Sequence, residues 1–269
     1  MKDKVVVITG GSSGIGKALA EVFGKNGSKI LITGRNKSDL DKAVAVLSQA
    51  GITVVGFVAD ASIEQDNKRM ADEAMKHFGK IDILINNAGI TMRALFEELD
   101  MSVIKKVMDI NFYGVLYATQ ACLPEITKNK GSVIGISSIA GFRGLPGRTG
   151  YSASKFALNG FLEVLRTEML YRGVHVLTAC PGFTSSNIRN KALTKDGSVQ
   201  GESPRDEDKM MTAEECASHI YRATLKRKNF LILTTQGRLA VWLNKLFPAL
   251  ADKMVYNVMA KEPNSSLKR

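Results

Sequence analysis

The chain has 269 residues and a formal net charge of +11, and 45% of its residues are hydrophobic while 23% are charged. These values are typical of a soluble globular protein and exclude disordered, collagen-like and coiled-coil chains. The longest apolar candidate for a membrane span, residues 239–250, is shorter than the roughly 18 residues that spanning requires, so we expect no transmembrane helix.

The amino terminus and the cysteines indicate the compartment. The apolar run at residues 5–8 is too short for the core of a secretion signal. The cysteines, Cys122, Cys180 and Cys216, form neither an even disulfide framework nor a metal-type spacing, and the three histidines are scattered. We therefore expect a cytoplasmic protein without a metal site.

Short apolar, β-branched runs alternate with helical patterns along most of the chain. The predicted strands cover residues 5–9, 30–33, 54–58, 81–85, 133–136, 174–179 and 230–233. The predicted helices lie near residues 15–23, 40–47, 67–78, 103–110, 112–126, 151–171 and 213–225. Apolar strands alternating with amphipathic helices indicate an α/β fold, a doubly wound parallel sheet of the Rossmann type in one domain.

Two segments depart from this alternation. Residues 187–210 are polar and contain glycines and a proline, so they are predicted to form a long loop of the kind that serves as a binding lid or is disordered. In residues 236–269 apolar side chains recur at helical spacing, with Pro248 as a kink. We expect a Rossmann-fold domain over 1–235 and an amphipathic extension over 236–269.

The positive charge is concentrated towards the carboxyl terminus. Residues 222–269 contain ten basic and two acidic side chains, whereas the preceding 221 residues contain 27 basic and 24 acidic ones. No nucleic-acid reading module accompanies these charges, so we expect no nucleic-acid partner. A basic amphipathic helix fits a membrane surface, and it equally fits packing on its own domain or on a second subunit.

A glycine-rich turn, Thr9–Gly16, follows the first predicted strand and precedes a helix. Such a turn lets a helix amino terminus meet a phosphate, although its spacing, Gly-x-x-x-Gly-x-Gly, is not the usual dinucleotide fingerprint. A structural turn without a ligand is the alternative. The residues predicted to bind the phosphates are Gly10, Ser12, Ser13, Gly14, Ile15 and Gly16.

The end of the second predicted strand bears on the choice of cofactor. Arg35 stands where an NAD enzyme usually has an acid, and its guanidinium suits a 2′-phosphate, so NADP(H) is favoured over NAD(H). Asp60 is placed to accept a hydrogen bond from an adenine amino group, and Asn87, Ala88 and Gly89 let the backbone approach a ribose. Surface solvation or turn chemistry would explain the same residues.

Tyr151 and Lys155 are i, i+4 neighbours on one face of a predicted helix. A nearby ammonium lowers the pKa of a tyrosine, which suits proton transfer, but an isolated pair of this kind is also common on solvated helices. With the turn at residues 9–16, the pair resembles the compact form of the short-chain dehydrogenase/reductase family. The other matching motifs are Asp60, Asn86-Asn87-Ala88-Gly89, Asn111, Ser138 and Pro181-Gly182.

The resemblance covers about residues 4–233 and implies a role for each matching position. Tyr151 would protonate a carbonyl oxygen as hydride arrives and would also contact the cofactor, and Lys155 would hold the nicotinamide ribose and lower the pKa of Tyr151. Ser138 would bind the substrate oxygen, and Asn111 would hold a water in a proton relay. Pro181, Gly182 and Thr184 would receive the nicotinamide. Ser13 replaces the basic residue that many NADP-preferring relatives have in the turn, leaving Arg35 as the main support for NADP(H).

The substrate walls are predicted at residues 90–95 and 140–149 and after Phe183. Their apolar side chains favour a lipophilic ketone or secondary alcohol, unless these side chains belong to the core. The chain resembles lipid-handling members of the family, such as 3-ketosphinganine reductases and hydroxysteroid dehydrogenases, and this resemblance implies a 3-keto lipid such as 3-ketosphinganine as a substrate. A reductase of small non-lipid carbonyls and a non-catalytic NADP(H)-binding redox sensor are the alternatives, and the resemblance implies a homodimer or homotetramer.

Overall fold

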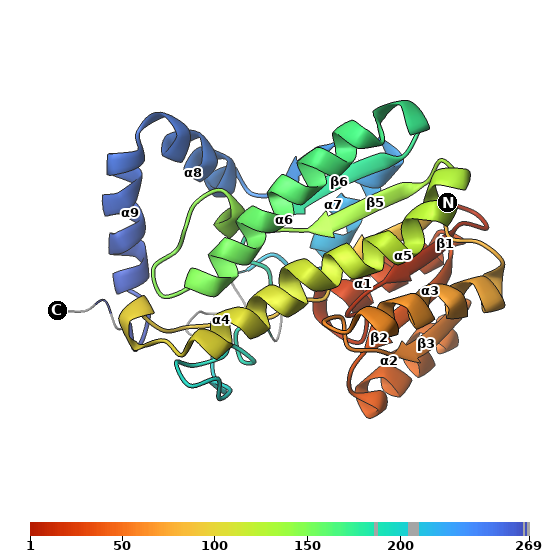
Figure 1. Cartoon of the computed structure of the whole chain (residues 1–269), viewed down its shortest axis with the longest axis horizontal. Coiled ribbons are helices and arrows are strands. Elements are labelled where there is room, and N and C mark those ends of the chain that lie inside the picture. Colours follow the sequence, from red (N-terminus) through yellow and green to blue (C-terminus); the bar gives the residue numbers. More distant parts are fainter. Residues whose placement is uncertain (186–187, 204–209, 266, 268–269) are drawn as a thin grey trace.

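The computed structural model of the chain describes residues 1–185, 188–203, 210–265 and 267. Its centre is a parallel sheet of seven strands in the order β3-β2-β1-β4-β5-β6-β7 (Figure 1). This sheet confirms the predicted α/β fold of the Rossmann type. The strands are β1 (Val5–Ile8), β2 (Lys29–Gly34), β3 (Val54–Val58), β4 (Ile83–Asn86), β5 (Ser132–Ile136), β6 (His175–Cys180) and β7 (Phe230–Ile232).

Helices cover both faces of the sheet because successive strand residues point to opposite sides. Val6 and Ile8 of β1 pack in one core cluster, while Val7 packs in the other. The first cluster lies under α1 (Gly14–Lys25), α2 (Lys37–Gln49) and α7 (Ala213–Leu225). The second lies under α3 (Glu64–Phe78), α5 (Gly114–Lys128) and α6 (Thr149–Glu168).

The helical segment before β5 differs from the two separate helices that the sequence predicts. Helix α4 (Met101–Met108) continues through a π-helical turn, Asp109–Tyr113, directly into α5. A π turn holds one extra residue within a continuous helix and often occurs at functional sites. It turns Asn111 into the protein, where this side chain is fully buried.

The carboxyl-terminal extension forms two helices, α8 (Thr235–Leu246) and α9 (Pro248–Ala260), and not one kinked helix. Pro248 is the first residue of α9, a position that tolerates proline because its missing N–H group would have no partner inside the helix. Both helices stand at one side of the molecule, beside the loop that leads into α6 (Figure 1).

A search of the described residues finds no helix that is long and apolar enough to cross a membrane. The same residues contain no group of three or more histidine, cysteine or acidic side chains suited to a metal ion. Cys122, Cys180 and Cys216 are all buried free thiols.

Candidate functional site

Most of the predicted site residues follow the carboxyl ends of four neighbouring strands. The turn at 9–16 follows β1, Asn87 follows β4, Ser138 follows β5 and Pro181 follows β6. In a parallel sheet these ends share one edge, and the strand order reverses between β1 and β4. The site therefore lies at the switch point where doubly wound folds bind their ligands.

The turn after β1 requires glycine at several positions. Gly10 and Gly14 have φ angles of +66° and +52°, in the left-handed region that other residues rarely adopt. A Cβ atom on Gly16 would lie 2.3 Å from the Gly10 carbonyl oxygen and 2.5 Å from the Asn87 amide nitrogen. A side chain at position 16 would therefore clash. Glycine lets the start of α1 lie directly against the turn after β1 and against the segment after β4.

Asn87 and Ala88 hold this turn in place. The hydroxyl oxygen of Thr9 accepts hydrogen bonds from the backbone amides of Asn87 at 3.0 Å and Ala88 at 3.1 Å. The side-chain amide of Asn87 donates to the carbonyl oxygens of Thr9 at 3.0 Å and Gly10 at 2.9 Å. Gly89 follows, where an added Cβ would lie 3.2 Å from the Asn111 side chain.

The amino terminus of α1 is suited to an anion. Ser13 is its N-cap residue but makes no side-chain capping hydrogen bond, and the first turn contains no acidic residue. The first amides of a helix point outward without partners inside the helix, and the helix dipole adds positive potential there. Beside them Ser12 packs against Gly34, while Ile15 packs on the core. These groups fit the pyrophosphate of a dinucleotide.

A cavity of about 250 Å³ lies at the ends of β2 and β3. Arg35 and Asp60 both line it, with 3.8 Å between the guanidinium and the carboxylate. The other carboxylate oxygen of Asp60 accepts hydrogen bonds from the backbone amide and hydroxyl of Ser62, at 2.9 and 2.7 Å. Sequence reasoning missed the contribution of α4, which places Lys105 and Lys106 at the same cavity. Only the packing of α4 beside the sheet reveals these two lysines.

Tyr151, Ser138 and Lys155 meet near the end of β5. The tyrosine hydroxyl lies beside the side chain of Ser138, close enough for Ser138 to lower its pKa, and the Ser138 oxygen accepts a hydrogen bond from the backbone amide of Ala140 at 3.1 Å. The Lys155 ammonium is buried and donates to the carbonyl oxygen of Ile136 at 2.8 Å. It lies 5.8 Å from the centre of the Tyr151 ring.

The protein's own groups shift the pKa values of this pair in opposite directions. Burial raises the pKa of Tyr151, and it outweighs Ser138 and the nearby Arg189 and Arg148, which lower it. Burial also lowers the pKa of Lys155 to about 8. The raised pKa of Tyr151 is contrary to the predicted lowering by Lys155, because burial of the hydroxyl dominates.

Asn111 connects the π turn to the site. Its side-chain oxygen accepts from the backbone amide of Ile90 at 2.8 Å, and its amide donates to the carbonyl of Ile90 at 2.9 Å and to the hydroxyl of Ser154 at 3.0 Å. The side chain thus ties the segment after β4 to the face of α6 that contains Ser154. These bonds use both N–H groups of the side chain, while its oxygen accepts one hydrogen bond and can accept a second.

The segment after β6 approaches the start of α8. A Cβ on Gly182 would lie 2.4 Å from a methyl carbon of Thr234. Thr184 is buried, and its carbonyl oxygen accepts a hydrogen bond from Arg189 at 2.7 Å. Part of the predicted loop, residues 187 and 204–209, lies outside the described residues.

Of the predicted substrate walls, Met92 lies in the core and not in a pocket. It is fully buried against Val103, Val107 and Leu193. Phe183, in contrast, is 48% exposed, and Phe142 packs edge-on against Phe230. Of the predicted walls, the segment at 90–95 thus contributes to the core cluster against which Tyr151 packs, and Phe183 remains half exposed.

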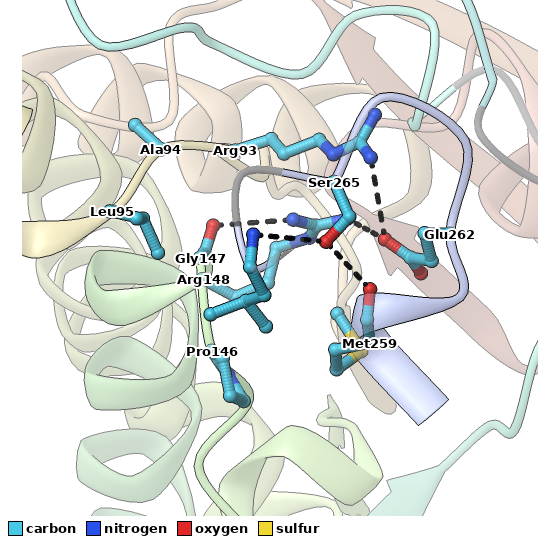
Figure 2. Close-up of a pocket in the computed structure, with 10 residues that line it drawn as sticks. Arg93, Ala94, Leu95, Pro146, Gly147, Arg148, Met259, Glu262 and Ser265 are labelled. Carbon is cyan, nitrogen blue, oxygen red and sulfur yellow. Dashed lines mark hydrogen bonds and ion pairs between the residues drawn. The ribbon is translucent and has the colours of Figure 1, made fainter. Parts of the chain in front are cut away.

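The extension is attached to these same loops (Figure 2). Glu262 follows α9 and is 6% exposed, and its carboxylate lies 3.2 Å from Arg148 and 3.8 Å from Arg93. The cavity beside these residues measures about 20 Å³, which is room for one water molecule. It is too small for a substrate, so the cluster serves to fasten the end of α9 beside Arg148, the N-cap residue of α6.

The chain is similar to known proteins in its sequence and in its fold. A family model described as short chain dehydrogenase matches residues 4–197. The Mus musculus protein named dehydrogenase/reductase SDR family member 7B is 34% identical over 271 residues, which are 98% of this chain and 84% of that protein. The Arabidopsis thaliana protein named 11-beta-hydroxysteroid dehydrogenase 1A is 34% identical over 257 residues, 93% of this chain and 73% of that protein.

Solved structures show the same architecture. A short chain dehydrogenase/reductase from Burkholderia phymatum, solved in complex with NAD, superimposes with a TM-score of 0.84. The match covers 93% of this chain and 95% of that one at 24% sequence identity. At this identity the likeness concerns the fold alone.

Proposed function

The chain belongs to the short-chain dehydrogenase/reductase family, and from this premise we propose that it is an NADP(H)-dependent reductase of lipophilic ketones. The observation that carries the proposal is the meeting of Tyr151, Ser138 and Lys155 beside the glycine turn. A binding protein or redox sensor without turnover would have no need to keep all three side chains together.

The nicotinamide cofactor would supply the hydride, and the protein's residues would bind it and manage the proton. The amino terminus of α1 would take its pyrophosphate. Lys155 makes one hydrogen bond, to Ile136, and an ammonium has three donors, so it retains the capacity to bind ribose hydroxyls. Tyr151 would donate its proton to the substrate oxygen, which Ser138 would also hold as charge develops on it.

The expected preference for NADP(H) is supported by the cations around the cavity of 250 Å³. Arg35, Lys105 and Lys106 line it, and Asp60 and Asp109 are its acidic residues. A guanidinium binds a phosphate through paired, charge-assisted hydrogen bonds, which an unphosphorylated ribose cannot provide. We propose that Arg35 selects the 2′-phosphate and that Asp60 faces the adenine.

Replacing Arg35 tests this assignment. The Arg35→Ala variant is expected to lose about 10- to 100-fold in kcat/KM with NADPH, since charge-assisted hydrogen bonds contribute about 1.5–3 kcal/mol, and to change little with NADH. Lys42→Ala, on the exposed side of α2, is the matched control. An equal loss with both cofactors would contradict a role for Arg35 in recognising the phosphate.

A lipophilic substrate is supported by half-exposed Phe183, which follows Pro181 and Gly182 at the end of β6, and by the name of one relative, which is called a hydroxysteroid dehydrogenase. Within this class, long-chain 3-keto lipids are the substrates that we propose to test first.

The proposed activity is tested by following NADPH oxidation with a panel of ketones. The intact chain is expected to turn over long-chain 3-keto lipids and steroid ketones with kcat/KM at least about tenfold above that of small polar ketones, because apolar burial adds about 0.8 kcal/mol per methylene. Faster turnover of the small polar ketones would favour the alternative, a reductase of small carbonyl compounds.

The oligomeric state and the compartment stay predictions. Tyr113, Phe156 and Val164 are large exposed side chains, at 45%, 47% and 57%, on the helical segments around α5 and α6 through which family members commonly pair. We propose a homodimer or homotetramer formed through these helices, in the cytoplasm.

A further inference from the structure

The helices α8 and α9 expose an unusual number of large apolar side chains. Trp242, Phe247 and Leu250 are each 50–55% exposed, and the rings of Trp242 and Phe247 are 6.2 Å apart where the two helices meet. Exposed apolar residues near them continue the surface along each helix. We call this set the corner patch: Leu239, Trp242, Leu246, Phe247, Leu250 and Met254.

The corner patch faces outward, and polar contacts join the buried Ala251 and Met259 in holding the other side of the extension against the domain. The only buried residue of α8 is Gly237, and those of α9 are Ala251 and Met259. Asn244 donates to the carbonyl oxygen of Phe142 and accepts from Arg143, both at 2.9 Å. Two amphipathic helices that merely packed on their own domain would turn their apolar faces inward.

Further ion pairs fasten α9 from the same side. Asp252 pairs with Arg143, and Glu262 pairs with Arg148 and Arg93. These two acids are the only ones in residues 236–269, and both are engaged with arginines of the domain. Around the corner patch this leaves the exposed basic side chains Arg238, Lys245, Lys253 and Lys261.

The corner patch combines an apolar surface with basic residues around it, and this combination suits the surface of a membrane. Aromatic and aliphatic side chains enter the boundary between lipid headgroups and acyl chains, while lysine and arginine are attracted to anionic headgroups. A second copy of the chain joined patch to patch by a two-fold axis would bring two basic rims together, and their repulsion disfavours that arrangement.

We propose that the corner patch docks the protein on the surface of a membrane that contains anionic lipids. Trp242 and Phe247 enter the interface, and the lysines around them contact the headgroups. The protein is held at the surface and does not cross the bilayer.

The position of the corner patch relates docking to the proposed substrate. Helix α8 approaches the short helix η3 (Ile139–Gly141), which directly follows Ser138, and a Cβ on Gly237 would lie 2.7 Å from the Ile139 side chain. Glu262 holds the end of α9 against Arg148, three residues before Tyr151. Docking would therefore bring the substrate loops close to the lipid that supplies a lipophilic ketone. This last step rests on the proposed function, whereas docking itself does not.

Sedimentation with sucrose-loaded vesicles tests docking without any turnover. The intact chain is expected to pellet with vesicles of phosphatidylcholine and phosphatidylserine, to pellet less with phosphatidylcholine alone, and to be released by high salt because salt screens the attraction. The Trp242→Gln/Phe247→Gln/Leu250→Gln variant is expected to bind the anionic vesicles at least about tenfold more weakly, since each buried apolar group contributes to the partition.

Two further variants make the result specific. Val46→Gln/Ile63→Gln/Leu170→Gln changes side chains that are 47%, 50% and 62% exposed elsewhere, and it should bind like the intact chain. Lys245→Glu/Lys253→Glu/Lys261→Glu leaves the apolar residues in place and should also lose binding. Docking can therefore still be tested if the Trp242→Gln/Phe247→Gln/Leu250→Gln variant fails to fold.

Three outcomes would overturn the proposal. The intact chain could stay in the supernatant with anionic vesicles, or the glutamine and glutamate variants of the extension could pellet as well as it does. Light scattering could instead show that the glutamine variant breaks an oligomer while the intact chain ignores vesicles, which would assign the corner patch to a second copy of the chain. A failure of the ketone assay with vesicle binding intact would count against the proposed function alone.

Discussion

The Tyr151→Phe variant is expected to lose about 10²- to 10⁴-fold in kcat for ketone reduction, which is the usual contribution of a positioned general acid. The change removes one hydroxyl, the group beside Ser138, and leaves the ring in its place beside Lys155. Cofactor binding, measured by the quenching of protein fluorescence with NADPH, should change by less than about threefold because the variant retains Lys155 and the glycine turn, the main groups assigned to the cofactor.

The matched control for this variant is Tyr171→Phe. Tyr171 is 97% exposed, so the loss of its hydroxyl should leave kcat and stability unchanged. The pH profile of the intact enzyme adds a second readout. Burial raises the pKa of Tyr151, so the hydroxyl retains its proton at neutral pH and reduction should fall only at alkaline pH. Comparable turnover by the Phe variant would remove Tyr151 from its proposed role.

The fold was predictable because its signals are local. Continuous β-branched runs such as Val5–Ile8 and Ile30–Thr33 can be buried on both faces only in a covered parallel sheet. The site residues were predictable for a related reason: they follow strand ends, which a parallel sheet brings to one edge. The positive φ angle at Gly10 and the tight packing at Gly16 both require glycine, and the glycine-rich turn in the sequence already indicates such positions.

Features set by contacts between distant segments were not predictable. Lys105 and Lys106 reach the cavity of Arg35 only because α4 lies beside the end of the sheet. The apolar spacing of the extension indicated amphipathic helices but not which face would turn outward. That choice depends on Arg143 and Arg148, about 100 residues earlier in the sequence. Likewise, the pKa of Tyr151 depends on how deeply the side chain is buried, and the spacing of a sequence motif does not indicate burial.

Replacing Lys155 is the second change with a large expected effect. It should lower activity and raise the stability of the fold. The Lys155→Met variant is expected to lose about 10²- to 10³-fold in kcat/KM, because it removes a buried cation that would hold the cofactor and stabilise charge in the site. Its stability at pH 7 should nevertheless rise. Burial lowers the pKa of this lysine from 10.5 to about 8, so at neutral pH the folded chain holds a desolvated ammonium.

Cys180 does not offset the cost of burying the charged Lys155 ammonium. Burial raises the pKa of its thiol to about 12, so it carries no negative charge at neutral pH. Within the described residues no ion pair is formed by Lys155, and its one hydrogen bond is to Ile136. The pKa difference corresponds to about 3 kcal/mol of destabilisation below pH 8, from which about 1 kcal/mol is deducted for that hydrogen bond. Methionine should therefore stabilise the chain by about 2 kcal/mol.

The pH dependence distinguishes this effect from ordinary repacking. Between pH 8 and 10.5 the unfolded chain binds more protons at Lys155 than the folded chain, so the stability of the intact protein should rise with pH across this range. The Met variant lacks that titration, and its advantage in urea unfolding should be largest below pH 8 and narrow towards 10.5. Lys42→Met, at an exposed position, should show no such difference. A Met variant that is less stable at pH 7 would mean that the protein itself stabilises the buried ammonium. An advantage that stays constant with pH would mean that the gain comes from repacking and not from the shifted pKa of Lys155.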